Sequence, residues 1–382
     1  MLFNHKTRVF IISAMSILTI IDSNGQKADF NGQVAAWGSI NFSDGTGAQM
    51  GGRYIPELSA EIPAGKKFKL DGDLSADGLL TYTHVPDSVN SVGSKAEFYR
   101  FWLRFSGQRF ELRAGLQKIS FGSAQMLRPL MWFDRIDPRD PLHLTEGVYG
   151  IQGKYTFRNN ANIWLWMLYG NKNPTGWETI PSEYKRPELG GRIQIPVPRG
   201  EMAFTYHNRV AEFPDNFQPP VTGKNTFPEN RFGYDIKLDL GIGLWLETSV
   251  TNQNQSQLPP YTKAATVGAD YTFGIGNGLN VTAEHMYYGT SGELFSNGET
   301  VSFTGISASI PVSVITRISA MFFYDWKDNG FYRFANLSLT FDKFAINIIG
   351  FWDPEVFEIF NYGTGPNMLA GAGGQVMVVY NY

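Results

Sequence analysis

The sequence predicts a single transmembrane antiparallel β-barrel of the up-and-down type, all-β, with about eighteen strands. Three observations predict it: segments of alternating polarity, aromatic residues near the ends of those segments, and connections that alternate between short and long. Successive side chains of a strand point to opposite faces, so alternation places the two faces in different environments. A soluble sandwich alternates too, but aromatic girdles and charges along the whole polar face favour a barrel in lipid.

The composition excludes several classes of protein. Of the 382 residues, 18% are charged and 15% aromatic, whereas soluble domains have roughly 25% charged residues. The absence of cysteine excludes disulfides, thiolate metal sites and a lipoprotein anchor. A net charge of −3 implies no attraction to nucleic acid. After the N-terminus no apolar run approaches the about 20 residues of a spanning helix.

The N-terminus has the pattern of a secretory signal peptide. Lys6 and Arg8 precede an apolar run of thirteen residues, and Ser23 and Gly25 are the small residues before a cut. We expect residues 1–25 to be removed and residues 26–382 to form one barrel domain in the outer membrane of a Gram-negative cell. An uncleaved anchor is the alternative, but thirteen residues are short for a membrane span.

The connections set the strand count. Short periplasmic turns are predicted near Pro63–Lys66, Gly107–Gln108, Asn159–Asn160, Pro198–Gly200, Gly241–Gly243, Ile275–Asn277, Pro311–Ser313 and Asp342–Lys343, with longer extracellular loops between them. The clearest strand is Arg231–Leu240, where charged and apolar residues alternate without interruption. The last segment places Tyr380 and Tyr382 on one face and ends on an aromatic residue. Outer-membrane barrels end in this way, so we expect the barrel-assembly machinery to recognise these two tyrosines.

The polar faces should line a lumen, and their charges are unevenly distributed. A basic wall is predicted from Arg100, Arg104, Arg109, Arg113, Lys154, Arg158, Arg192 and Arg209, and an acidic wall from Asp235, Asp239, Glu247, Asp270 and Glu284. Two such walls would produce a transverse field that shapes selectivity. The alternative is that these charges pair across the interior and plug it.

The third long loop, Lys118–Thr145, is unusually apolar for a loop in water. We expect it to fold into the barrel and to narrow the pore. The predicted constriction residues are Arg128, Trp132, Asp134, Arg135, Asp137, Arg139 and Asp140. An extracellular cap held by salt bridges is the alternative.

Other kinds of site have weaker signals. Four tryptophans fall on or near the inward face of the predicted strands: Trp102, Trp164, Trp166 and Trp245. They would suit a saccharide track, although such residues more often pack against a loop. The histidines are scattered singly and no catalytic constellation is present. We therefore expect no enzymatic activity, no metal and no cofactor.

The mature chain resembles outer-membrane porins of the Bacteroidetes type. The resemblance rests on Gln26 after the cut, Leu127-Arg128-Pro129-Leu130, the segment Asp134–Pro141 and the closing Tyr380-x-Tyr382. In eighteen-stranded specific porins and alginate exporters, an inward loop and a basic interior line the solute path. The resemblance implies that role here for Arg100, Arg104, Arg113, Arg128, Arg135 and Arg139.

The first hypothesis for function is a porin-like channel for small hydrophilic solutes, with anions or zwitterions preferred. The alternatives are an exporter of an acidic polysaccharide and a non-conducting structural or receptor barrel of a surface complex. The expected partners are outer-membrane lipid and small hydrophilic solutes, with no nucleic acid.

Overall fold

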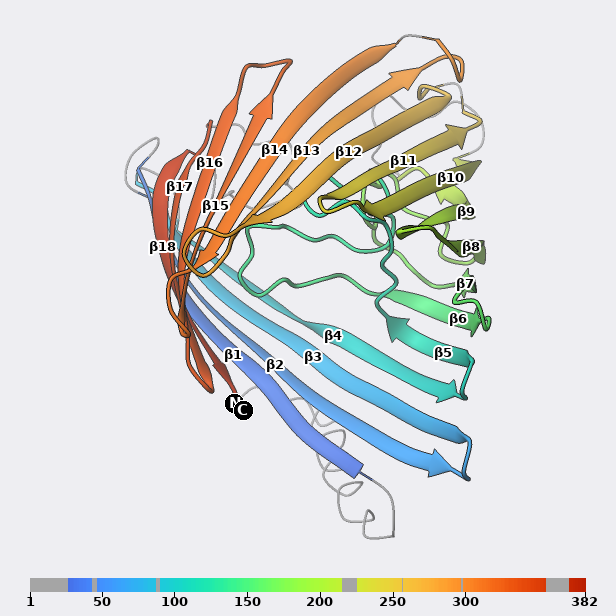
Figure 1. The fold of residues 1–382 in the computed structure, drawn as a ribbon, viewed down its shortest axis with the longest axis horizontal. Helices are drawn as coiled ribbons and strands as arrows, with labels where there is room; N and C mark the ends of the chain where they lie inside the picture. Colours follow the sequence, from blue (N-terminus) through green and yellow to red (C-terminus); the bar gives the residue numbers. More distant parts are fainter. Residues whose placement is uncertain are drawn as a thin grey trace.

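The chain forms one closed sheet of antiparallel strands. The computed structural model describes residues 27–42, 47–86, 90–214, 225–255, 257–296, 298–354 and 371–382. Eighteen strands follow one another around the barrel, and the first strand pairs with both the second and the last (Figure 1). Closure leaves no strand edge with unpaired backbone groups, which lipid could not satisfy. The predicted fold class is confirmed. No helix in the described part of the chain is long and apolar enough to cross a membrane.

The strand bounds are β1 Lys27–Asn41, β2 Gly47–Ala64, β3 Phe68–His84, β4 Ser91–Ser106, β5 Phe110–Gln117, β6 Val148–Thr156, β7 Asn162–Leu168, β8 Glu188–Val197, β9 Gly200–Glu212, β10 Thr226–Asp239, β11 Gly243–Gln253, β12 Tyr261–Phe273, β13 Leu279–Ser291, β14 Glu299–Pro311, β15 Thr316–Asp325, β16 Phe331–Thr340, β17 Phe344–Trp352 and β18 Ala372–Asn381. The predicted signal peptide, residues 1–25, lies outside the described residues.

The predicted short turns all coincide with connections between consecutive strands, although four of them overlap a strand end by one or two residues, at Pro63, Ala64, Gly200, Gly243 and Pro311. Two of them show the backbone geometry that tight turns require. Asn160 has a φ of 65° and Gly241 a φ of 90°, in the left-handed region that Asn and Gly tolerate best.

The outer face of the barrel is apolar and exposed. On β4, Phe101 and Leu103 are 55% and 62% exposed, whereas the intervening Trp102 and Arg104 turn inward and are partly buried. The same alternation recurs on every strand, with large apolar residues outside. A continuous exposed apolar surface of this kind faces lipid rather than water.

The third loop lies inside the barrel. It runs over residues 118–147, two residues beyond the predicted end, because β6 begins at Val148. In Figure 1 the chain that follows β5 crosses the interior before it returns to β6. The buried apolar residues of the molecule are concentrated where this loop meets the inner wall.

Candidate functional site in the barrel interior

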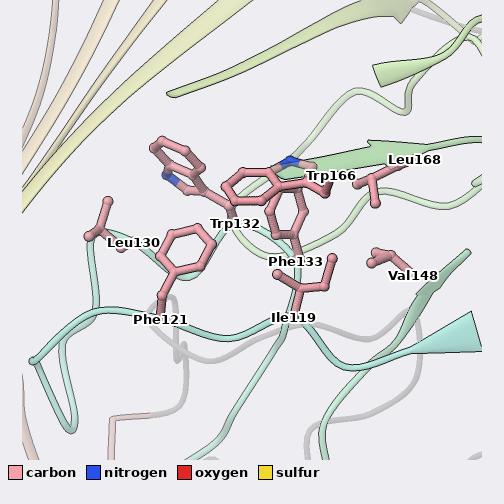
Figure 2. Packing of buried hydrophobic residues seen from close by; sticks show 8 residues of the cluster. All are labelled: Ile119, Phe121, Leu130, Trp132, Phe133, Val148, Trp166 and Leu168. Atoms are coloured by element: carbon pink, nitrogen blue, oxygen red, sulfur yellow. The ribbon is translucent and has the colours of Figure 1, made fainter. Parts of the chain in front are cut away.

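The third loop is held against β6 and β7 by an apolar cluster. Phe121 and Trp132 of the loop pack against Trp166, with the rings of Phe121 and Trp166 stacked 5.8 Å apart (Figure 2). Phe133, 1% exposed, meets the edge of Trp166 at 5.6 Å. Burial of such aromatic side chains contributes roughly 1.5–3 kcal/mol each. The loop is therefore a packed element of the barrel and not a solvated segment.

Two carboxylates of the wall bind the backbone of the third loop. Glu247 on β11 accepts hydrogen bonds from the amides of Ser123 (2.7 Å), Ala124 (2.9 Å) and Leu130 (2.7 Å). Glu284 on β13 accepts those of Gln125 (2.6 Å), Met126 (2.9 Å) and Leu127 (2.7 Å). Buried amides without a ladder partner need such acceptors. Charge-assisted hydrogen bonds of this kind anchor the loop strongly.

A glycine makes this approach of loop and wall possible. Gly122 has a φ of 102°, and a Cβ there would collide with the carboxylate of Glu247. Glu247 and Glu284 are 0% and 2% exposed. Both were predicted to line the pore, and for both the prediction is wrong, because the loop covers them.

The predicted separation into a basic and an acidic wall is also wrong for the residues that pair. Arg192 on β8 donates to Asp235 on β10 at 2.6 Å, and the two side chains are 4% and 3% exposed. Arg209 is buried against Glu178 and Glu229. Arg192 and Asp235 face each other across β9, and Arg209 and Glu229 lie on the neighbouring strands β9 and β10, so these opposite charges neutralise each other locally.

Three predicted wall residues lie at the turn end of the barrel. Arg109 and Arg158 are exposed and fall in the turns, because β5 begins at Phe110 and β6 ends at Thr156. Asp239 is the exposed last residue of β10. The predicted strand register continued too far into the turns, and these residues do not belong to the walls. Asp270 is partly buried and accepts a hydrogen bond from Gln125 at 3.3 Å.

The wall made by β2 to β5 remains accessible from the interior. Arg104 pairs with Asp71 at 2.7 Å, and Arg113 pairs with Glu111 at 3.0 Å. The exposed fractions of Arg104, Glu111 and Arg113 are 27%, 27% and 19%.

Sequence reasoning missed three inward carboxylates of β3, two of which, Asp71 and Asp77, pair with arginines of this wall. Asp71, Asp73 and Asp77 recur at even spacing on its inward face, and Asp77 pairs with Arg53 at 3.1 Å. That spacing is the signal that could have identified them.

Several interior cations have no carboxylate within 4 Å among the described residues: Lys237 on β10, Arg317 on β15, and a group of three near the start of the third loop, Arg100, Lys118 and Lys154. Arg100 donates to the carbonyl of Thr145 at 3.0 Å and to its hydroxyl at 2.6 Å. Lys154 lies 4.5 Å from the ring of Trp164. Lys118 lies at the start of the third loop, where loss of water around its amino group lowers its pKa.

Most predicted constriction residues stabilise the loop and do not face the lumen. Arg128 pairs with Asp134 at 3.1 Å, and Trp132 donates to Ser249 at 3.0 Å. Arg128, Asp134 and Trp132 are 7%, 1% and 2% exposed. Asp140 accepts the amides of Leu142 and Leu144, and burial raises its pKa. Arg135 and Asp137 are only partly buried.

The end of the third loop reaches the opposite side of the barrel. Leu142 packs against the cluster of Met377 and Val379 on β18. Arg139, 4% exposed, pairs with Asp137 at 2.8 Å and with Asp353, directly after β17, at 3.5 Å. Burial raises the pKa of Asp353 to about 6. The loop thus contacts the wall from β6 around to β18.

The four tryptophans considered for a sugar track, and the buried His207, are held by contacts within the protein. Trp166 and Trp245 are each 3% exposed, so neither offers a face to a sugar, whereas Trp102 and Trp164 are covered by Arg113 and Lys154 at 4.7 and 4.5 Å. His207 is buried between Glu188 and Trp166. Within the described residues, no group of three or more His, Asp or Glu could hold a metal.

Comparisons with known proteins agree with this architecture. No family model matches the sequence, and no curated protein matches it. OccK7 (OpdD) of Pseudomonas aeruginosa aligns over 94% of this chain and 99% of its own, with a TM-score of 0.56 and 9% identity. The fold is that of the outer-membrane porins. OccAB1 of Acinetobacter baumannii gives a TM-score of 0.56 at 9% identity, covering 94% of this chain and 97% of that one. An anion-selective porin from Comamonas acidovorans gives 0.50 at 12%, covering 94% and 100%.

Proposed function

We propose that this chain is an outer-membrane channel through which small hydrophilic solutes diffuse, with a weak preference for anions. The observation that carries the proposal is the accessible charge on the inner face of β2 to β5. Arg53, Arg104 and Glu111 keep 20%, 27% and 27% of their side-chain surface exposed inside the barrel. Charged groups with that exposure need water around them. A water-filled path beside this wall is what a diffusion channel requires.

The weak anion preference comes from the cations that lack a carboxylate partner. Most interior charges are paired, and paired charges contribute little net potential. Among the described residues, Arg100, Lys118 and Lys154 are exceptions that lie together, on the side of the barrel formed by β4, β6 and the start of the third loop, whereas the unpaired Lys237 and Arg317 lie apart from them on β10 and β15. A positive potential in a narrow aqueous passage raises the local concentration of anions.

The path of the third loop argues against the export of an acidic polysaccharide. The loop is anchored on β11 and β13 and reaches β18, so it crosses the lumen that a polymer would need. The finer resemblances, to Bacteroidetes-type porins and alginate exporters, gain no support from the comparisons and form no part of the proposal. The prediction that the chain is not an enzyme stays a prediction.

The test is conductance of the refolded protein in a planar bilayer, with the reversal potential measured under a salt gradient. We expect steady ohmic conductance with a small anion bias. The variant R100Q/K118Q/K154Q should shift the reversal potential toward cation preference. The matched control R109Q/R158Q/R199Q removes three exposed cations from the turns and should shift it less.

Each outcome separates the alternatives. A folded barrel that does not conduct would support the non-conducting structural or receptor reading. Conductance with equal shifts in the two variants would remove the selectivity role from Arg100, Lys118 and Lys154 while leaving the channel.

A further inference from the structure

A second feature of the interior is a cavity of about 220 Å³ at the loop end of the barrel. It lies between the third loop, residues 177–180 of the loop that joins β7 to β8, and the inner faces of β9 to β13. We call it the vestibule pocket. Sites for drug-sized molecules have roughly 300–1,000 Å³, so an occupant of this pocket is smaller.

One side of the vestibule pocket is a row of three threonines on adjacent strands. Thr251 on β11 is directly opposite Thr262 on β12, and Thr262 is directly opposite Thr290 on β13. All three side chains line the pocket and are partly exposed. Their hydroxyls make no hydrogen bond with any described residue, although opposed threonines in a sheet commonly bond to each other. The row therefore offers three donors and acceptors to a ligand.

An aromatic pair lies beside the row. Tyr288 lies two residues before Thr290 on β13 and faces the same side of the sheet. Its ring centroid lies 6.4 Å from that of Trp177, and the two ring planes are inclined at 34°. Trp177 donates its indole N–H to the carbonyl of Arg128 at 2.7 Å, which fixes the ring against the third loop. Both rings line the pocket. Aromatic faces contact the C–H face of a sugar ring while hydroxyl groups bind its edge.

The charged residues of the vestibule pocket compensate one another. Arg209 pairs with Glu178 and Glu229 at 3.2 and 2.7 Å, and Arg231 pairs with the same two carboxylates at 2.7 and 2.6 Å. Two cations and two anions leave no net charge. A charged ligand would find no free counter-charge, whereas a neutral ligand needs none.

We propose that the vestibule pocket binds one ring of a neutral sugar, a free hexose or the end of a short oligosaccharide, before it passes the third loop. The proposal deepens the proposed channel function and rests on it for the route by which the sugar leaves. Free hydroxyls, fixed aromatic faces and compensated charge are together the chemistry that recognises a neutral polyol and discriminates against its acid.

Binding is measured by equilibrium dialysis of radiolabelled glucose and gluconate against the refolded protein in micelles. We expect saturable glucose binding in the millimolar range and weaker gluconate binding. In T251V/T262V/T290V each residue keeps its shape and loses its hydroxyl, and each lost hydrogen bond weakens binding severalfold, so glucose affinity should fall at least tenfold. The control T248V/T272V/T316V removes three hydroxyls outside the pocket and should bind as the parent protein does.

Three results would overturn the proposal: no saturable glucose binding to the folded protein, gluconate bound more tightly than glucose, or unchanged affinity in T251V/T262V/T290V. Dialysis needs no current, so glucose binding by a barrel that does not conduct would reject the proposed channel while keeping the pocket. Conductance without glucose binding would do the reverse.

Discussion

The two sides of the barrel interior use the same residue types for different purposes. On β2 to β5 the paired side chains Arg104, Glu111 and Arg113 keep 19% to 27% of their surface exposed. On β8 to β13 the exposure of the pair Arg192 and Asp235 is 4% and 3%, and Glu247 is wholly buried. Both sides follow the same alternation of inward polar and outward apolar residues.

The difference lies in what covers each side. The third loop packs over β11 and β13, so the carboxylates there lose water and accept loop amides in its place. A buried charge without such partners would cost several kcal/mol. On β2 to β5 the ion pairs remain in contact with solvent, where each contributes little to stability. An inward charge is therefore a structural element on one side and a part of the aqueous surface on the other.

The largest expected loss of stability follows removal of the two carboxylates that anchor the third loop. In E247Q/E284Q each new glutamine side chain keeps one acceptor oxygen but places its NH₂ group against the backbone N–H donors of the loop. With hydrogen bonds to charged groups at about 1.5–3 kcal/mol, we expect a loss of roughly 4–6 kcal/mol in the free energy of unfolding. Residues 118–147 should become sensitive to protease and the conductance should rise. The control E61Q/E111Q changes two carboxylates of the accessible wall; if its loop became equally sensitive, the anchoring role would be refuted.

A second test compares a buried with an exposed ion pair. D235N leaves Arg192 buried without its anion, and loss of one partner of such a pair costs about 3–5 kcal/mol. E61Q breaks the Lys69–Glu61 pair, whose side chains are 38% and 47% exposed, and should cost about 0–1 kcal/mol. Urea unfolding in vesicles, followed by tryptophan fluorescence, measures both. Equal losses would mean that water reaches Asp235 as freely as Glu61.

The contact of the third loop with the far wall should depend on pH. Burial raises the pKa of Asp353 to about 6 from an ordinary 3.8, so the folded protein holds this proton more tightly than the unfolded chain. Its contribution to stability is present below pH 4 and is lost as pH rises through 6. D353N, which mimics the neutral acid, should match the parent protein at pH 4 and exceed it by roughly 1–2 kcal/mol at pH 7.5. The same difference at both pH values would exclude titration of Asp353 in this range.

The sequence predicted the strands and turns well because both depend on local patterns. Alternation and turn residues identify a segment such as Arg231–Leu240 without knowledge of its neighbours. Whether an inward residue faces water depends on the path of a loop far away in the chain, and no local pattern records that path. Glu247 and Glu111 look alike in sequence, yet only the first is covered. The predicted recognition of Tyr380 and Tyr382 by the assembly machinery stays a prediction.

The smallest expected change in stability comes from a carboxylate of the accessible wall. E111Q removes a carboxylate that lies 3.4 Å from Arg104 and 3.0 Å from Arg113, all three partly exposed. Stability should fall by less than about 1 kcal/mol, yet the two guanidinium groups lose a counter-charge beside the proposed water path. The reversal potential should therefore move toward anions, while D235N, despite its larger loss of stability, should leave it unchanged where the barrel stays folded. A shift in D235N without one in E111Q would place the permeant water on the other side of the barrel.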